Sequence, residues 1–133
     1  MRILIVEDDY TSMKLMQKLL SAYGDTTTAS NGEEALECVR LALEEEKPYE
    51  LICLDIMMPG IDGHQVLKSI RAMEKVRGIT PKDEAKIIMT TALDSPKDVI
   101  EAYYQGGCSS YLVKPIEKQQ LVDKLDELGL INT

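Results

Sequence analysis

The chain has 133 residues, of which 44% are hydrophobic and 29% are charged, a balance typical of one soluble globular domain and not of a disordered chain. Acidic residues outnumber basic ones by 23 to 15, and the net charge of -8 argues against direct binding to nucleic acid or to an anionic membrane. The N-terminal apolar segment is too short for a signal peptide, and no run approaches the roughly 20 apolar residues of a membrane span. The three cysteines follow no metal-binding spacing. We therefore expect a reduced, cytoplasmic protein with a single domain over residues 1–133.

Short runs rich in branched residues alternate with segments of helical length. The runs are the expected strands: residues 3–6 (ILIV), 26–29 (TTTA), 51–56 (LICLDI), 86–91 (KIIMTT) and 110–113 (SYLV). Strands that alternate with helices predict an α/β fold with a parallel sheet covered on both faces. A run that is apolar on both faces, such as 3–6, suits a central strand, whereas the threonines of 26–29 suit an edge.

Capping signals mark where the intervening helices begin. Ser30 with Glu33 and Ser95 with Asp98 have the spacing of capping boxes, and Asp62 is a candidate N-cap for the helix that follows it. Apolar residues recur at helical spacing near the C-terminus: Leu121, Val122, Leu125 and Leu128. The helices therefore fall between the strands and after the last one.

Polar residues stand at the ends of several predicted strands, which in an open parallel sheet is where functional groups gather. They are Glu7, Asp8, Asp9, Asp55, Thr90, Thr91 and Lys114. Two carboxylates about 4 Å apart repel by roughly 4 kcal/mol at an effective dielectric near 20, and one lysine cannot neutralise three of them. Mg²⁺ binds carboxylates, waters and a phosphate oxygen, so we expect a Mg²⁺ site here with Asp55 as a carboxylate nucleophile toward phosphorus.

Each of these residues also has a simpler explanation. Acids after a strand commonly form a solvated turn or cap a helix, and Asp55 before Met-Met-Pro-Gly can be a turn residue. Thr91 suits a strand by propensity, and Lys114 can be an ordinary surface lysine. The shared position on one predicted rim is what favours a common site over these separate explanations.

Four segments carry a resemblance to a known family. They are ILIVEDD (3–9), LDIMMPGIDG (54–63), MTTA (89–92) and YLVKP (111–115). In order and spacing they resemble the motifs of response-regulator receiver domains of two-component signalling, and the chain is similar to single-domain CheY-like regulators. The resemblance implies a flavodoxin-like, doubly wound sheet of five parallel strands in the order 2-1-3-4-5 with five flanking helices.

The resemblance also implies roles for individual residues. Asp55 would be the phosphoacceptor, and Mg²⁺ would be held by Glu7, Asp8, Asp55 and the backbone carbonyl of Met57. Phosphoryl binding and switching would involve Thr91, Ala92, Lys114 and Tyr111. The Lys114–Pro115 peptide bond would be cis. Glu7 stands where the family often has Asp. Metal binding stays plausible there through the longer side chain of glutamate.

The function implied is phosphoryl acceptance from a sensor histidine kinase or phosphotransfer protein. The receiver would assist its own phosphorylation and slow dephosphorylation without being an enzyme. The surface formed by the fourth helix, fifth strand and fifth helix would then change shape and control a downstream protein, or form a phosphorylation-dependent homodimer. Met57 and Leu93 flank the acceptor without a group that could orient an attacking water, so we expect slow self-dephosphorylation.

Other classes of protein combine similar catalytic residues, a metal ion or a similar topology. A Mg²⁺-dependent phosphohydrolase with an aspartate nucleophile would resemble its class in an Asp-x-Asp motif after the first strand, but Tyr10 follows Asp8 by two places. A flavodoxin-like cofactor binder needs Ser, Thr and Gly donors in the first loop, where this chain has acids. An interaction module without phosphorylation would not need a complete acceptor site. A last alternative is a receiver module cut from a longer regulator.

Overall fold

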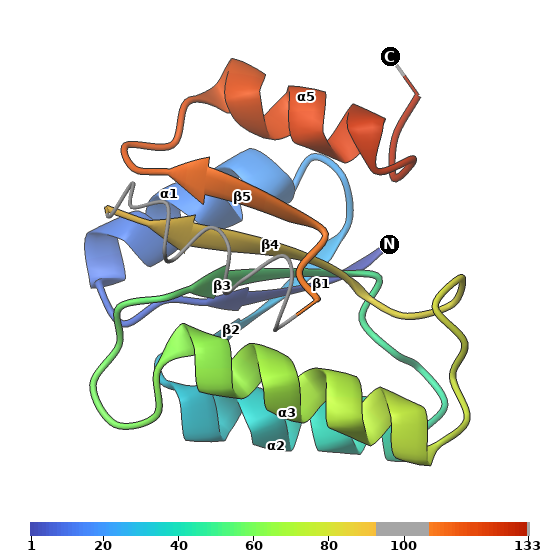
Figure 1. Cartoon of the computed structure of the whole chain (residues 1–133). Coiled ribbons are helices and arrows are strands. Elements are labelled where there is room, and N and C mark those ends of the chain that lie inside the picture. The colour runs from blue at the N-terminus through green and yellow to red at the C-terminus, as the bar shows by residue number, and fades with distance from the viewer. Residues whose placement is uncertain (93–106, 133) are drawn as a thin grey trace.

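Five parallel strands form the centre of the protein in a computed structural model that describes residues 1–92 and 107–132 (Figure 1). They are β1 (Arg2–Val6), β2 (Asp25–Ala29), β3 (Leu51–Asp55), β4 (Lys86–Thr91) and β5 (Ser110–Val113). Their spatial order is β2-β1-β3-β4-β5, and every neighbouring pair is parallel. The predicted fold class and strand order are confirmed, and each predicted strand boundary is correct to within one residue.

Helices cover both faces of the sheet. They are α1 (Tyr10–Leu20), α2 (Gly32–Glu44), α3 (Gly63–Val76) and α5 (Lys118–Glu127). Figure 1 shows α2 and α3 on one face and α1 and α5 on the other. The remaining predicted helix, with Ser95 and Asp98 at its start, falls on residues 93–106 and lies outside the described residues. None of the helices in the described ranges combines the length and apolarity that crossing a bilayer requires.

Side chains of the central strands alternate between two buried cores. Leu4 and Val6 of β1 pack on the side of α2 and α3, whereas Ile3 and Ile5 pack on the side of α1 and α5. Both faces of β1 are therefore buried, which is why its sequence is an unbroken apolar run. The edge strand β2 alternates between exposed and partly buried residues until Ala29, as its threonines predict.

Side-chain caps fix the starts of α2 and α3. The Asp62 carboxylate accepts a hydrogen bond from Gln65 N at 3.0 Å, and the Gln65 amide oxygen accepts one from Asp62 N at 3.0 Å, so the predicted cap is confirmed as a full capping box. The prediction for α2 is wrong by one residue. Asn31 is the N-cap and accepts from Glu34 N at 2.8 Å, whereas Ser30 donates its hydroxyl to the Glu34 carboxylate. Both residue types cap well, so composition alone does not choose between neighbours.

Close packing at the start of α3 holds the end of β3. Gly63 N donates to Ile56 O at 3.0 Å. A Cβ on Gly63 would lie 2.4 Å from Asp55 O and 2.7 Å from Ile56 Cα, both of them backbone atoms. Only glycine lets the helix approach β3 this closely, so Gly63 helps to set the position of Asp55.

We expect Gly63→Ala to lower the free energy of unfolding by about 1–3 kcal/mol, because the new methyl group meets backbone that cannot move aside. Helix propensity alone predicts the opposite sign, since alanine is the better helix former. Ala72→Gly, at an exposed position of the same helix, measures that propensity contribution separately. Urea denaturation of the three proteins decides the matter, and an unchanged or raised stability of Gly63→Ala would contradict the packing argument.

Candidate functional site

The carboxyl ends of neighbouring strands bring three acids together. Glu7 follows β1, and Asp55 is the last residue of β3. The strands are aligned so that Val6 of β1 lies opposite Leu54 of β3, which puts the next residue of each strand at the same level. Carboxylate oxygens of Glu7, Asp8 and Asp55 all lie within 4.8 Å of one another.

Two of the three acids are buried. Glu7 and Asp55 are each 3% exposed, whereas Asp8 is exposed. Removing a carboxylate from water is costly unless it is paired or binds a cation. Asp55 thus lies at the end of its strand, as predicted, but well below the surface.

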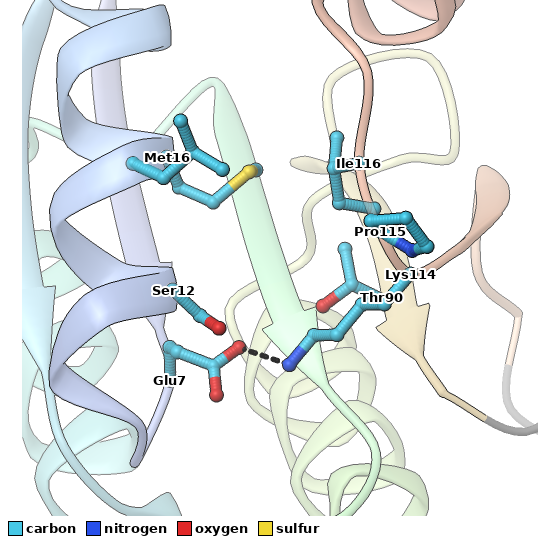
Figure 2. Close-up of a pocket in the computed structure, with 8 residues that line it drawn as sticks. Glu7, Ser12, Met16, Thr90, Lys114, Pro115 and Ile116 are labelled. Atoms are coloured by element: carbon cyan, nitrogen blue, oxygen red, sulfur yellow. Dashed lines mark hydrogen bonds and ion pairs between the residues drawn. The ribbon is translucent and has the colours of Figure 1, made fainter.

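Lys114 approaches the acids from the end of β5. Its ammonium nitrogen Nζ lies 2.6 Å from Glu7 Oε2 (Figure 2). The same nitrogen lies 3.6 Å from Asp55 Oδ2. Its backbone N donates to Thr91 O at 2.7 Å, which fixes the start of the chain segment that follows β5. The peptide bond between Lys114 and Pro115 is cis, the isomer that the resemblance implies.

Backbone N–H groups hold the two buried carboxylates. Asp9 N donates to Glu7 Oε1 at 3.2 Å, and Met57 N donates to Asp55 Oδ1 at 3.2 Å. The third acid of the first loop, Asp9, turns away to cap α1. It accepts from both the backbone N and the hydroxyl of Ser12, and these hydrogen bonds lower the pKa of Asp9. Asp9 therefore contributes its N–H to the site, and its carboxylate serves the helix.

The environment of Asp55 favours its protonated form. Burial, together with the hydrogen bond and negative charge of nearby Glu7, raises the pKa of Asp55 to about 7, although Lys114 and the Met57 N–H act in the opposite direction. Burial alone would lower the pKa of Lys114, but its hydrogen bond to Glu7 and the charges of both acids outweigh burial and raise it. The lysine is therefore charged, and one ammonium balances at most one of three carboxylates.

The donor set matches what a magnesium ion needs. All three acids offer hard oxygen ligands, and two of them are buried with more negative charge than Lys114 offsets. Met57 follows Asp55 by two residues and is 57% exposed at the rim. The predicted role of its carbonyl as a ligand stays a prediction.

The other predicted site residues lie on β4 and β5. Thr91 ends β4 and is fully buried, and Ala92 follows it on the surface. Tyr111 is partly buried on β5 opposite Met89 of β4 and packs against the core beside α2 and α3. Leu93, predicted to flank the acceptor, lies outside the described residues.

A cavity of about 360 Å³ adjoins the acids on the side of α1 (Figure 2). Its walls are formed by Glu7, Ser12, Leu15, Met16, Thr90, Lys114, Pro115 and Ile116. The sequence analysis did not predict this cavity, because its lining comes from three segments far apart in the chain. No local pattern in any one of them indicates it.

Comparison with known proteins identifies the family to which a chain with this site belongs. The model of the response regulator receiver domain matches residues 3–126. The chain belongs to this family.

Similar receiver sequences occur in proteins of very different length. The polar-differentiation response regulator DivK of Brucella anthropi is 34% identical over 92% of this chain and 91% of its own length. The response regulator PleD of Caulobacter vibrioides is 32% identical over 96% of this chain, which spans only 26% of PleD. The sensor histidine kinase GacS of Pseudomonas protegens is 35% identical over 90% of this chain, which spans 12% of GacS.

Solved receiver structures match this chain over most of its length. CheY of Borrelia burgdorferi, solved as a complex with CheX, BeF₃ and Mg²⁺, has a TM-score of 0.82 at 25% identity and covers 96% of this chain and 88% of its own. The response regulator TrrA of Thermotoga maritima, solved with Mg²⁺ and BeF, has a TM-score of 0.73 at 33% identity. The match covers 96% of this chain and 97% of the TrrA chain.

The raised pKa of Asp55 makes the stability of the metal-free receiver domain depend on pH. Between about pH 4 and 7 the folded state holds a proton that the unfolded state, with an ordinary pKa of 3.8, has released, so stability falls as pH rises through this window. We expect Asp55→Asn to remove this loss. In a chelator at pH 8 the variant should be more stable by roughly 1–3 kcal/mol, the scale of a poorly compensated buried polar group.

Denaturant unfolding at several pH values tests this expectation. The difference between Asp55→Asn and wild type should shrink as pH falls from about 7 toward 4, because the folded wild-type carboxyl takes up its proton over this range. Asp126→Asn makes the same substitution on the exposed face of α5 and should show no such pH dependence. A stability difference for Asp55→Asn that stays constant with pH would rule out the proposed origin.

Proposed function

We propose that this chain accepts a phosphoryl group on Asp55 from a sensor histidine kinase or a phosphotransfer protein, with Mg²⁺ bound. The observation that carries the proposal is the position of one carboxylate. Asp55 lies at the end of β3 within 4.8 Å of two further acids and 3.6 Å from the ammonium of Lys114. Such a site can gather positive charge around a transferring phosphoryl group.

In this proposal Glu7, Asp8 and Asp55 hold Mg²⁺, together with the backbone carbonyl of Met57. The ion would supply positive charge to the phosphoryl oxygens and keep Asp55 ionised. The presence of Mg²⁺ and a beryllium fluoride in the structures of similar receivers supports this assignment. It agrees with the surplus of buried negative charge at this site.

The chain's own groups would then carry out the transfer. An oxygen of the Asp55 carboxylate attacks phosphorus, the bond from phosphorus to the histidine nitrogen breaks, and that nitrogen keeps the electron pair. The product is an aspartyl phosphate. Lys114 holds one phosphoryl oxygen by a charge-assisted hydrogen bond, and the Thr91 hydroxyl donates to another, with Ala92 beside them.

The new group would switch the surface of the protein. Thr91 is drawn toward the phosphoryl group, Tyr111 moves into the space that it leaves, and the surface of the predicted fourth helix, β5 and α5 changes shape. Turning a mostly inactive population into a mostly active one needs about 5.5 kcal/mol of differential stabilisation. Two or three hydrogen bonds to a charged group, worth about 1.5–3 kcal/mol each, can supply it.

The switched surface would control a downstream protein or a homodimer. In this proposal the receiver assists its own phosphorylation and its slow dephosphorylation, without the multiple turnover of an enzyme. We place it in the cytoplasm because its three cysteines are unpaired. The alternative is that the same site works as the receiver module of a longer regulator.

Incubation with acetyl phosphate and Mg²⁺, followed by intact mass measurement, tests the acceptor directly. We expect one added phosphoryl group that is lost on treatment with hydroxylamine, because an acyl phosphate is labile to nucleophiles. Asp55→Asn should abolish the addition, and a chelator should prevent it in the wild type. Asp126→Asn should be phosphorylated like the wild type, and a stable phosphoryl group or one retained in Asp55→Asn would refute the assignment.

Hydrolysis of the phosphorylated protein should be slow. Met57 stands at the rim beside Asp55 with an exposed side chain that cannot orient an attacking water. We expect the isolated phosphoprotein to persist for minutes or longer, measured by the decay of its mass signal after the donor is removed. Met57→Gln introduces an amide at this position and should speed the decay several-fold. A half-life of seconds or less in the wild type would contradict this expectation.

A further inference from the structure

The cavity between α1 and the segment that follows β5 has a polar end and an apolar end. Figure 2 shows Met16 and Ile116 at one end, and Glu7 with the ammonium of Lys114 at the other. The volume of about 360 Å³ falls in the range of small-molecule sites, and an apolar cavity of about 150 Å³ is already large enough to bind benzene. The cavity can therefore hold a small organic molecule that carries one polar group.

Four side chains form the apolar end. They are Leu15 and Met16 of α1, and Pro115 and Ile116 of the segment after β5. Leu15 is 45% exposed, so this end of the cavity is open to solvent. A ring or a short aliphatic chain placed here would remove its own apolar surface and that of the lining from water, which favours its binding.

The polar end offers hydrogen-bond acceptors. Ser12 donates its hydroxyl proton to the Asp9 carboxylate at 2.7 Å, so it has only lone pairs left for a molecule in the cavity. Thr90 also lines the cavity and is 4% exposed, and its hydroxyl has no hydrogen-bond partner among the residues that the structure describes. Figure 2 shows both hydroxyl oxygens pointing into the space between the two residues. A buried hydroxyl without a partner is costly, so Thr90 marks a place for a ligand atom.

The charge at the polar end favours a cation. The carboxylate of Glu7 lines the cavity, and Asp8 and Asp55 lie within 4.8 Å of it. One lysine, Lys114, cannot balance these three acids and is already paired with two of them. An anion would therefore be repelled. A primary ammonium group has three N–H donors, which match the carboxylate and the two hydroxyl oxygens of the polar end.

We propose that this cavity binds a small primary amine, with its ammonium group beside Glu7, Ser12 and Thr90 and its apolar body against Met16 and Ile116. The inference goes beyond the proposed function, because the amine needs neither Mg²⁺ nor a phosphoryl group to bind. Two separate observations support it: the unpartnered hydroxyl of Thr90 and the apolar space beside the acids.

Titration of the ¹⁵N-labelled full chain with benzylamine, benzyl alcohol and benzoate tests the site and its preference for a cation. The three compounds share one aromatic ring and differ in their polar group. In a chelator at pH 7 we expect benzylamine to shift the backbone amide signals of Ser12, Met16 and Ile116. It should bind about tenfold more tightly than benzyl alcohol, because its hydrogen bonds are charge-assisted, and benzoate should bind most weakly.

The signals of α3, which lies on the other face of the sheet, should not move in these titrations (Figure 1). Equal affinity for benzylamine and benzyl alcohol would overturn the proposal, because the acids would then contribute nothing to binding. Shifts confined to residues outside the cavity lining would overturn it as well.

Thr90→Val isolates the contribution of the unpartnered hydroxyl. Valine keeps the branched shape and suits a strand, so the sheet should be preserved. We expect this variant to bind benzylamine roughly fivefold more weakly than the wild type, the effect of one hydrogen bond. Thr27→Val makes the same change at an exposed position of β2 and should leave the affinity unchanged. Equal affinities of the two variants would overturn the predicted position of the ammonium group.

Ile116→Trp tests the apolar end of the cavity. The larger side chain occupies the space and should abolish binding at benzylamine concentrations that saturate the wild type. Thermal unfolding shows whether each variant is folded at the temperature of the titration. Unchanged affinity in a folded Ile116→Trp protein would overturn the proposal.

These outcomes are independent of the proposed function. The titrations contain a chelator and no phosphodonor, so a failure to bind benzylamine refutes the amine site alone. A failure of acetyl phosphate and Mg²⁺ to modify Asp55 refutes the proposed function alone.

Discussion

Buried negative charge at the carboxyl end of the sheet is the constraint on which the site depends. Glu7 and Asp55 are withdrawn from water with carboxylate oxygens within 4.8 Å of each other and of Asp8. Two local responses reduce the repulsion: Lys114 pairs with Glu7, and Asp55 is driven toward its protonated form. A protonated carboxyl group is a poor nucleophile. Under the proposed function, the same charge that would attract a cation therefore makes Asp55 less nucleophilic until the cation is bound.

The parallel sheet creates this cluster and also supports it. Because all five strands run in the same direction, the residues that follow β1, β3, β4 and β5 meet at one rim without any long loop to bring them together. Packing below the rim is dense on both faces, and Gly63 lets α3 close directly onto the backbone of Asp55. Backbone N–H groups of Asp9 and Met57 then orient the two buried carboxylates. Packing and backbone hydrogen bonds thus hold the acids in place against their mutual electrostatic repulsion.

Much of this could be predicted from the sequence because the relevant signals are local. Apolar runs in the sequence predicted the strands, and the polar residues at the ends of these runs predicted the rim of the sheet. The sequence alone could therefore assign Glu7, Asp8, Asp55 and Lys114 to one site. The cap of α2 was misassigned because Ser30 and Asn31 are both good N-caps. The closer pairing of Lys114 with Glu7 than with Asp55 could not be predicted, since it joins residues 107 positions apart and depends on differences of about an ångström. The cavity beside them has the same origin in distant segments.

Glutamate at position 7 changes how strongly the site depends on its cation. With a shorter acid, the ammonium of Lys114 would face Asp55 directly, lower its pKa and so favour a reactive carboxylate even without metal. With Glu7, Lys114 lies closer to Glu7 than to Asp55, and Asp55 keeps a pKa of about 7. A cation bound by these acids would add positive charge beside Asp55 and so favour its ionised form.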